Sequence, residues 1–461
     1  MAEAAANLSW NGIELESLRQ IMDPPADEAI QSLYDSDNMH HLRDLLVNMA
    51  ENDDLVSHEL PKALHDFVQA ELEYEFTDYD IEMFQKTHQV WKDHGMEFCF
   101  VLFFRSLPYT YMAEKPANVL RMTKLLEEQP ERRVFETAQF VFDIMDEEWW
   151  TPHKRGLLTT LKVRLMHASM RHVIIDKQGG ELWDEARWGK PISQEDLLAT
   201  NQTFSLEFFK GIEMLGESLD EEEKEAWFHH WKIIGKLLGV EERLLAKDID
   251  EAWDLQHKIY DHLFNDATFA GIGLAKALVE TMAHFMLNHK FILLILKRTL
   301  ADEQFPDCFD SLLAPTYDKV YPEVFHKPQS QEEQDEHDEL LRGHFHDHLR
   351  DYHKRVGEHR DSAKSKSSKP GFFQRLKGLF SRKGDNKPHL IDFHLDIFHG
   401  ILHHEGTKNP IEYLEEEMIT KAMKSIGGVM VGIMSRYFRK GKKSGFRIPD
   451  NIVDHWSLEK R

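Results

Sequence analysis

Apolar side chains recur with a spacing near 3.6 residues along almost the whole chain, and this periodicity is the strongest constraint on its fold. Two examples are Leu42, Leu45, Leu46 and Met49, and then Leu197, Phe204, Leu206 and Phe209. Such spacing gathers apolar residues on one face of a helix. Strand signals are few, because the run HVII at 172–175 is too short to form a sheet. We therefore expect an all-α, multi-helix, globin-like fold.

Composition and charge narrow the classes of partner. Of the 461 residues, 41% are hydrophobic and 30% charged, which is typical of a soluble globular protein. The formal net charge of −25 argues against nucleic acid as a partner. Two cysteines, Cys99 and Cys308, form neither a disulfide framework nor a zinc quartet. No obligate protein partner is indicated.

The longest apolar run covers residues 268–300, but charged and histidine side chains interrupt it. No uncharged stretch within it reaches the ~18 residues that a membrane-spanning helix needs. The run therefore predicts a buried helix pair, which could line an apolar pocket. The first residues carry neither a basic nor an apolar segment, so they do not resemble a secretory signal. We expect a cytoplasmic protein.

The composition divides the chain into three regions. Residues 1–326 read as a helical domain, 327–390 as a flexible insertion rich in histidine and basic residues, and 391–461 as helices that complete the domain. Within the insertion, residues 372–383 combine an apolar face with basic charge. That pattern fits a helix in peripheral contact with a membrane, and it equally fits one that covers the protein's own acidic surface. Histidines elsewhere in the insertion favour adventitious metal binding over a specific site.

Residues 160–173 carry the most unusual helical face. Arg164, His167 and Arg171 fall within about 60° of one another on a largely apolar helix, and His172 lies beside them. A buried charge needs a partner, yet this helix contains no carboxylate. The anion must come from another helix or from a ligand. A haem would supply it, because imidazole ligates iron and arginines pair with propionates.

The stretch RLMHASMRH resembles the R-x-x-H-x-x-x-R-H signature of the latex-clearing rubber oxygenases and MpaB-type oxygenases. The resemblance implies that His167 is the proximal iron ligand of a haem b, with Arg164, Arg171 and His172 around the same cofactor. The haem would be bound without covalent links, since no C-x-x-C-H occurs.

Further motifs extend the resemblance. RVFETAQFVFDIM resembles the family's distal R-x-x-[KE]-T helix, which implies roles at the distal side for Arg133, Glu136 and Thr137. The block from WGKPIS to GKLLGV also matches, and the likeness runs from MDPPAD near residue 22 to about 325, resuming at FRIPDNIVDHW. The implied function is a haem-dependent oxygenase that uses O2 to oxidise an apolar, olefinic or isoprenoid-like small molecule.

Two roles for Glu136 stay open. In an apolar pocket its pKa would rise, and the carboxylate could accept a proton during oxygen insertion. It could instead be the structural counter-ion of Arg164 or Arg171.

Other functions compete with the oxygenase. The main alternative is a non-catalytic haem-binding or lipid-binding protein on the same scaffold. A helical di-iron site would need paired E-x-x-H motifs, of which Glu323 and His326 provide one. Glu280 and His284 have the wrong spacing for a second.

Overall fold

The computed structural model describes residues 8–35, 61–122, 137, 140–145, 155–177, 183–264, 267–286, 289–301, 304–327, 330 and 333. The predicted C-terminal helices at 391–461 and the predicted amphipathic segment at 372–383 lie outside these residues, as does nearly all of the predicted insertion at 327–390. These three remain predictions.

The described chain is helical apart from one small hairpin, so the all-α prediction is confirmed. The hairpin pairs β1 (Ser9–Trp10) with β2 (Ile13–Glu14). The helices are α2 (Leu15–Leu18), α3 (Pro24–Asp35), α5 (Lys62–Leu72), α6 (Asp78–Val101), α7 (Leu107–Met112), α8 (Glu114–Met122), α11 (Arg155–His172), α12 (Glu185–Trp188), α13 (Gln194–Met214), α14 (Glu221–Leu237), α15 (Ile249–Leu263), α16 (Phe269–Met286), α17 (His289–Thr299), α18 (Cys308–Tyr317) and α19 (Pro322–Phe325). Two π-helical turns, η1 (Leu102–Ser106) and η3 (Val173–Lys177), and a 3-10 turn, η4 (Glu242–Leu244), complete the elements.

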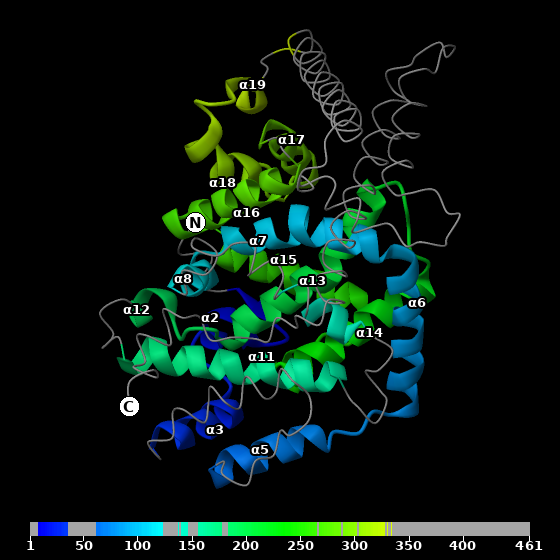
Figure 1. Ribbon diagram of the computed structural model, residues 1–461, viewed down its shortest axis with the longest axis vertical. Helices are drawn as coiled ribbons and strands as arrows, with labels where there is room; N and C mark the ends of the chain where they lie inside the picture. The colour runs from blue at the N-terminus through cyan, green and yellow to red at the C-terminus, as the bar shows by residue number, and fades with distance from the viewer. Residues whose placement is uncertain are drawn as a thin grey trace, which may run out of the picture.

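Helix α13 lies at the centre of the fold, packed between α6, α14 and α15 (Figure 1). Its first turn is fixed by a capping box. The Ser193 side chain accepts a hydrogen bond from the backbone N–H of Asp196, and the Asp196 carboxylate accepts one from the N–H of Ser193. Such reciprocal bonds satisfy helix-end donors that would otherwise be buried without partners.

Helix α11 lies on one side of this centre, and α3 and α5 pack against its outer face (Figure 1). The contact is apolar. Leu161, Leu165 and Ala168 of α11 meet Ile30 of α3 and Leu64 of α5 in a small core of their own. At the far end of the molecule, α16 packs on α7, α8, α17 and α18. The layers therefore place α11 between the central helices and the pair α3 and α5.

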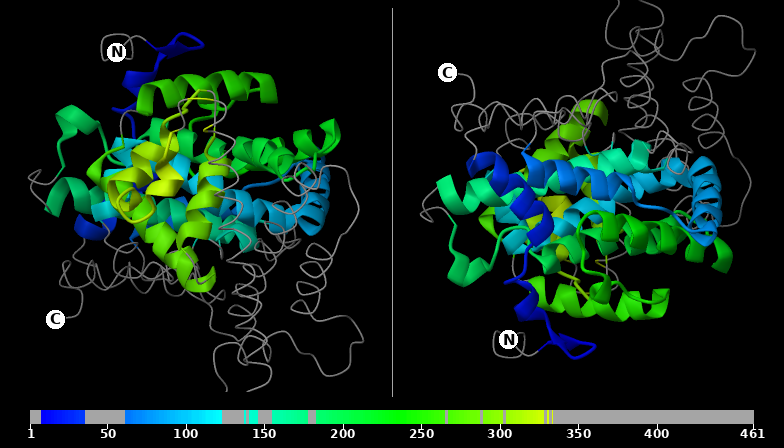
Figure 2. Two further views of the ribbon diagram at one scale, coloured as in Figure 1. Left: turned by 90° about the horizontal axis from the view of Figure 1, so that it is seen from above. Right: turned by 90° about the horizontal axis from the view of Figure 1, so that it is seen from below.

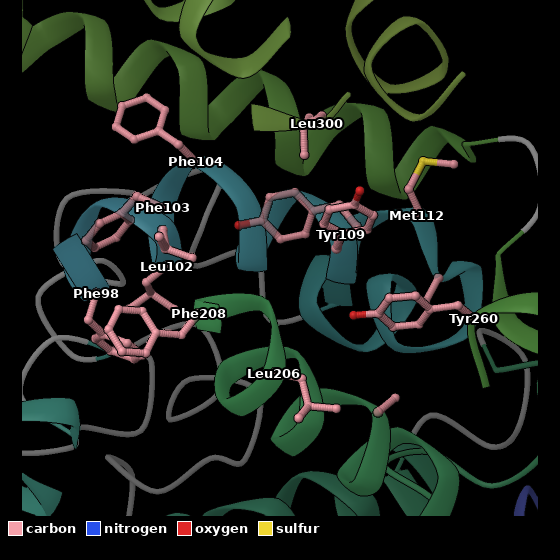
Figure 3. Close-up of a cluster of buried hydrophobic side chains, with 14 of the residues drawn as sticks. Phe98, Leu102, Phe103, Phe104, Tyr109, Met112, Leu206, Phe208, Tyr260 and Leu300 are labelled. Atoms are coloured by element: carbon pink, nitrogen blue, oxygen red, sulfur yellow. The ribbon is translucent and has the colours of Figure 1, made fainter. Parts of the chain in front are cut away.

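The main core forms where α6 and η1 meet α13 and α15. Phe98 and Phe208 pack edge to face with their ring centroids 5.4 Å apart, and Tyr109 stacks on Tyr260 (Figure 3). The N-terminal hairpin lies beside α15 in both views of Figure 2. There the Asn11 side-chain amide donates to Glu251 over 3.0 Å.

The run at 268–300 folds as the predicted pair of helices, α16 and α17, with most described side chains buried. Within the described residues, no helix combines the length and the apolar character needed to cross a membrane.

Candidate functional site

Helix α11 carries the Arg-His-Arg face, and it is enclosed on most sides. Arg164 and Arg171 are buried, with 8% and 1% of their surfaces exposed, and His167 between them is half-buried. Thr160 and Val163, which lie near His167 on the helix surface, are also buried. The structure therefore encloses two guanidinium groups in a low-dielectric environment, where each needs a counter-charge.

Arg164 finds its counter-charges outside its own helix. Its Nε and Nη2 donate to the two oxygens of Asp23 over 2.7 and 2.9 Å, in a bidentate pair. Its Nη1 donates to Glu71 of α5 over 2.9 Å. The guanidinium also lies 5.2 Å from the ring centroid of Phe67. All three nitrogens of Arg164 are thus bonded to carboxylates.

Arg171 is held by the same segment. Its Nε donates to Asp27 of α3 over 2.6 Å, and its Nη1 donates to the Ile192 carbonyl over 3.3 Å. Its Nη2 lies 3.9 Å from Asp23. The anion expected from another helix or from a ligand therefore comes, for both arginines, from protein carboxylates beside α11.

Burial opposes the charge on these carboxylates. Burial raises the pKa of Asp27, and the adjacent Arg171 counteracts part of that rise. Burial likewise raises the pKa of Glu71, against the effect of Arg164. Together with Asp23, three carboxylates face two guanidiniums, so protein groups supply the counter-charge for both Arg164 and Arg171.

Sequence reasoning missed these carboxylates, although one signal was present. Asp23 directly precedes Pro24 and Pro25, and aspartate followed by proline is a typical helix start. Its backbone N–H is bonded to the Asp27 carboxylate over 3.1 Å. MDPPAD therefore has a function beyond marking where the resemblance begins: it brings two carboxylates to α11.

The other site residues predicted from the sequence lie in different environments or outside the described residues. The His172 ring lies on Tyr34, with centroids 3.3 Å apart. Thr137 is helical and half-buried, whereas Arg133 and Glu136 lie outside the described residues. A hydrogen bond of 2.8 Å from the Thr159 hydroxyl to Asp143 ties the helical residues 140–144 to α11.

The described residues do not assemble the di-iron alternative. Glu323 pairs with Lys290 over 2.5 Å, and His326 bonds to Glu333 over 3.1 Å. Glu280 bonds to His289 over 2.6 Å. Across the described part of the chain, no group of three or more His, Cys, Asp or Glu side chains could hold a metal ion.

The region of the chain that contains α11 matches a known protein family. Residues 91–301 match the family model described as "ER-bound oxygenase mpaB/B'/Rubber oxygenase, catalytic domain". Over these residues the chain is similar to this family's catalytic domain. The matched region contains His167, Arg164, Arg171, His172 and Thr137, whereas Asp23, Asp27 and Glu71 precede it.

Individual relatives are distant. A rubber oxygenase from Streptomyces sp. (strain K30) is 27% identical over 122 residues, which cover 26% of this chain and 29% of that protein. The structure of a latex clearing protein, in a closed state, aligns with a TM-score of 0.56 at 19% identity, over 74% of this chain and 93% of the other. This second likeness supports the shared helical fold.

Proposed function

We propose that this protein is a haem b-dependent oxygenase that acts with O2 on an apolar, olefinic or isoprenoid-like small molecule, with His167 as the iron ligand. The observation that carries the proposal is the half-buried imidazole on α11, held between two arginines within the oxygenase family's catalytic region. Iron in a porphyrin needs only one or two protein ligands, so a single histidine is a sufficient donor set.

The arginines support the site through protein carboxylates. The sequence leaves their anion open between another helix and a ligand such as a haem propionate, and in the structure Asp23, Asp27 and Glu71 engage both guanidiniums. We assign them to holding α11 in place. The haem itself would supply O2 binding and activation, and the protein would contribute the axial ligand, the orientation of the substrate and the exclusion of water.

The Thr159–Asp143 bond supports a distal role for Thr137, Glu136 and Arg133. His167 follows Thr159 by eight residues, about 12 Å along a helix, and Thr137 precedes Asp143 by six, about 9 Å. If the two segments are antiparallel helices, both distances run the same way from the bond, so Thr137 and His167 lie within about one helical turn of each other along the α11 axis. Since protein carboxylates already neutralise both arginines, we favour proton acceptance over ion pairing for Glu136.

An absorption spectrum tests the proposal. Protein from haem-replete cells should show a Soret band with about one haem b per chain, and His167→Ala should lose the band while far-ultraviolet helicity stays. His257→Ala is the matched control, because His257 is an exposed histidine on α15. A colourless wild type, or a His167→Ala variant that keeps its Soret band, would refute the assignment.

O2 consumption then separates the oxygenase from a non-catalytic haem or lipid carrier. A haem-loaded protein should consume O2 when an isoprenoid olefin is added after reduction. Haem binding without olefin-dependent O2 uptake would identify a carrier.

A further inference from the structure

Asp23 is the carboxylate that faces both arginines of the His167 helix. It forms a bidentate pair with Arg164, and it lies 3.9 Å from Arg171. Of the two arginines, Asp27 is bonded to Arg171 alone and Glu71 to Arg164 alone. With 2% of its surface exposed, Asp23 is also the most buried of the three carboxylates.

The backbone around Asp23 is held on both sides. The carbonyl of Met22 accepts a hydrogen bond of 2.7 Å from the Gln194 side chain, and the carbonyl of Ile21 accepts one of 2.8 Å from the Gln194 N–H. The N–H of Asp27 donates to the Asp23 carbonyl over 2.9 Å. The carboxylate is therefore fixed relative to the first turn of α13.

Gly239, in the loop after α14, packs directly against the ion pair of Asp23 and Arg164. Its φ is +96°, and a side-chain carbon there would lie 2.3 Å from an oxygen of Asp23 and 3.0 Å from Nε of Arg164. A Cβ would collide with the salt bridge, so the backbone at Gly239 packs tightly against it and neither charged group has room to shift toward this loop.

The geometry of α11 gives this pair a consequence for His167. Arg164 precedes His167 by three residues and Arg171 follows it by four. The two therefore lie about one turn before and one turn after the imidazole, and both are rotated to the same side of it around the helix, by about 60° and 40°. A rigid group that contacts both arginines restrains the rotation of α11 and its sliding along its axis. The direction in which His167 projects is set by the same restraint.

We propose that Asp23 is a positioning residue for His167, acting through Arg164 and Arg171. This inference rests on the proposed function for the role of the imidazole as an iron ligand, although the restraint itself is a property of the protein alone. Groups that orient a ligating histidine typically change metal affinity 10–100-fold when they are removed.

The test compares Asp23→Asn, which keeps the shape of the side chain and removes its charge, with Asp27→Asn and Glu71→Gln, which each affect one arginine. Two quantities are measured on the full chain as purified: the rate at which haem is lost to excess apomyoglobin, and the rate of carbethoxylation of His167 by diethylpyrocarbonate, followed by peptide mass spectrometry. We expect Asp23→Asn to raise both rates about tenfold or more, and each control to raise them less.

The outcomes separate this inference from the proposed function. Haem loss and carbethoxylation rates in Asp23→Asn that equal those of the controls would overturn the positioning role while leaving the haem assignment intact. A wild type without haem would refute the proposed function, and the carbethoxylation rates would still decide whether Asp23 orients His167. If Asp23→Asn does not fold, Arg164→Lys keeps the charge but loses the bidentate geometry, and wild-type rates in that variant would also contradict the inference.

Discussion

His230 illustrates what burial does to a single titratable residue in this protein. It lies on α14 with only 2% of its surface exposed, and its ring meets Phe84 edge to face at 5.1 Å. Burial lowers the pKa of His230 from 6.5 to about 3, although a hydrogen bond with the backbone of Ile144 partly offsets the shift. The folded protein therefore keeps this imidazole neutral at pH values where the unfolded chain protonates it.

The pH dependence of stability should reveal this shift. The stability that neutral His230 contributes is fully present above the unfolded pKa of 6.5, and it is lost as the pH falls toward 3. Between pH 7.5 and 5 we expect a loss of about 2 kcal/mol from this residue, at 1.36 kcal/mol per pKa unit. Urea unfolding of His230→Gln should lack that loss, whereas exposed His257→Gln should behave as wild type. An unchanged pH slope in His230→Gln would contradict the pKa shift.

At the scale of elements, the π-turn η1 reshapes the central helix pair. It continues α6 with one wider turn, and such insertions often mark functional or strained positions. Arg105 within it reaches into the core, where its Nε donates to Glu207 of α13 over 2.6 Å and its Nη1 to the Thr299 carbonyl over 2.6 Å. Just before the turn, Val101 lies against Gly211 of α13. The crossing of α6 and α13 therefore depends on a close approach beside a buried ion pair.

Gly211→Ala should loosen this crossing. A Cβ at Gly211 would lie 2.3 and 2.5 Å from the two methyl carbons of Val101, and overpacking of this kind costs about 1–3 kcal/mol. Val101→Ala provides room for the added methyl group. The double variant should therefore be destabilised by about 1 kcal/mol less than the sum of the two single destabilisations. Chemical denaturation of the four proteins measures the coupling. Strictly additive effects would show that the two helices adjust without strain.

At the scale of the whole molecule, residues 19–27 form a connecting segment between elements far apart in sequence. Arg19 is fully buried and bonded to Asp196 and to the Ser193 hydroxyl at the start of α13. Its carbonyl accepts from the N–H of Lys190 over 2.7 Å. The same segment supplies Asp23 to α11. One stretch of nine residues thus joins α11 to the start of α13.

Removing the charge of Arg19 should destabilise the whole molecule rather than one helix. Arg19→Gln leaves Asp196 buried without its partner, which typically costs about 3–5 kcal/mol. Arg187→Gln is the control, because its pair with Glu114 is formed by a side chain that is 61% exposed, and such pairs contribute about 0–1 kcal/mol. Thermal denaturation measures the stability of the two variants. Amide exchange at Lys190 and Gln194 measures how well the contacts of the segment with the start of α13 are kept. Wild-type exchange protection in Arg19→Gln would show that the segment does not hold the elements together.

The sequence predicted what depends on local spacing. Periodicity predicted the helices, and the charges that interrupt 268–300 predicted two buried helices. Each of these features is decided by residues within a few turns of one another. The need for an anion beside Arg164 and Arg171 also followed from local composition.

The identity of that anion could not be predicted, because it depends on packing between distant segments. Asp23 and Arg164 are separated by 141 positions, and many other acidic residues could have met the same need. A ligand carboxylate satisfies an arginine as well as an aspartate does, so composition alone could not choose between the two. Tertiary packing made that choice by bringing α3 and α5 onto the outer face of α11.

The connecting segment also has a consequence for the order of events during biosynthesis. Arg19 leaves the ribosome well before Asp196, which lies 177 positions later. At the usual ~5–20 residues per second, translation takes roughly 10–35 s to reach it. Throughout that interval the nascent chain carries an arginine that will be buried but has no carboxylate to meet. The helix that bears His167 is translated before Asp196, so α11 cannot be joined to the start of α13 until α13 itself has been made.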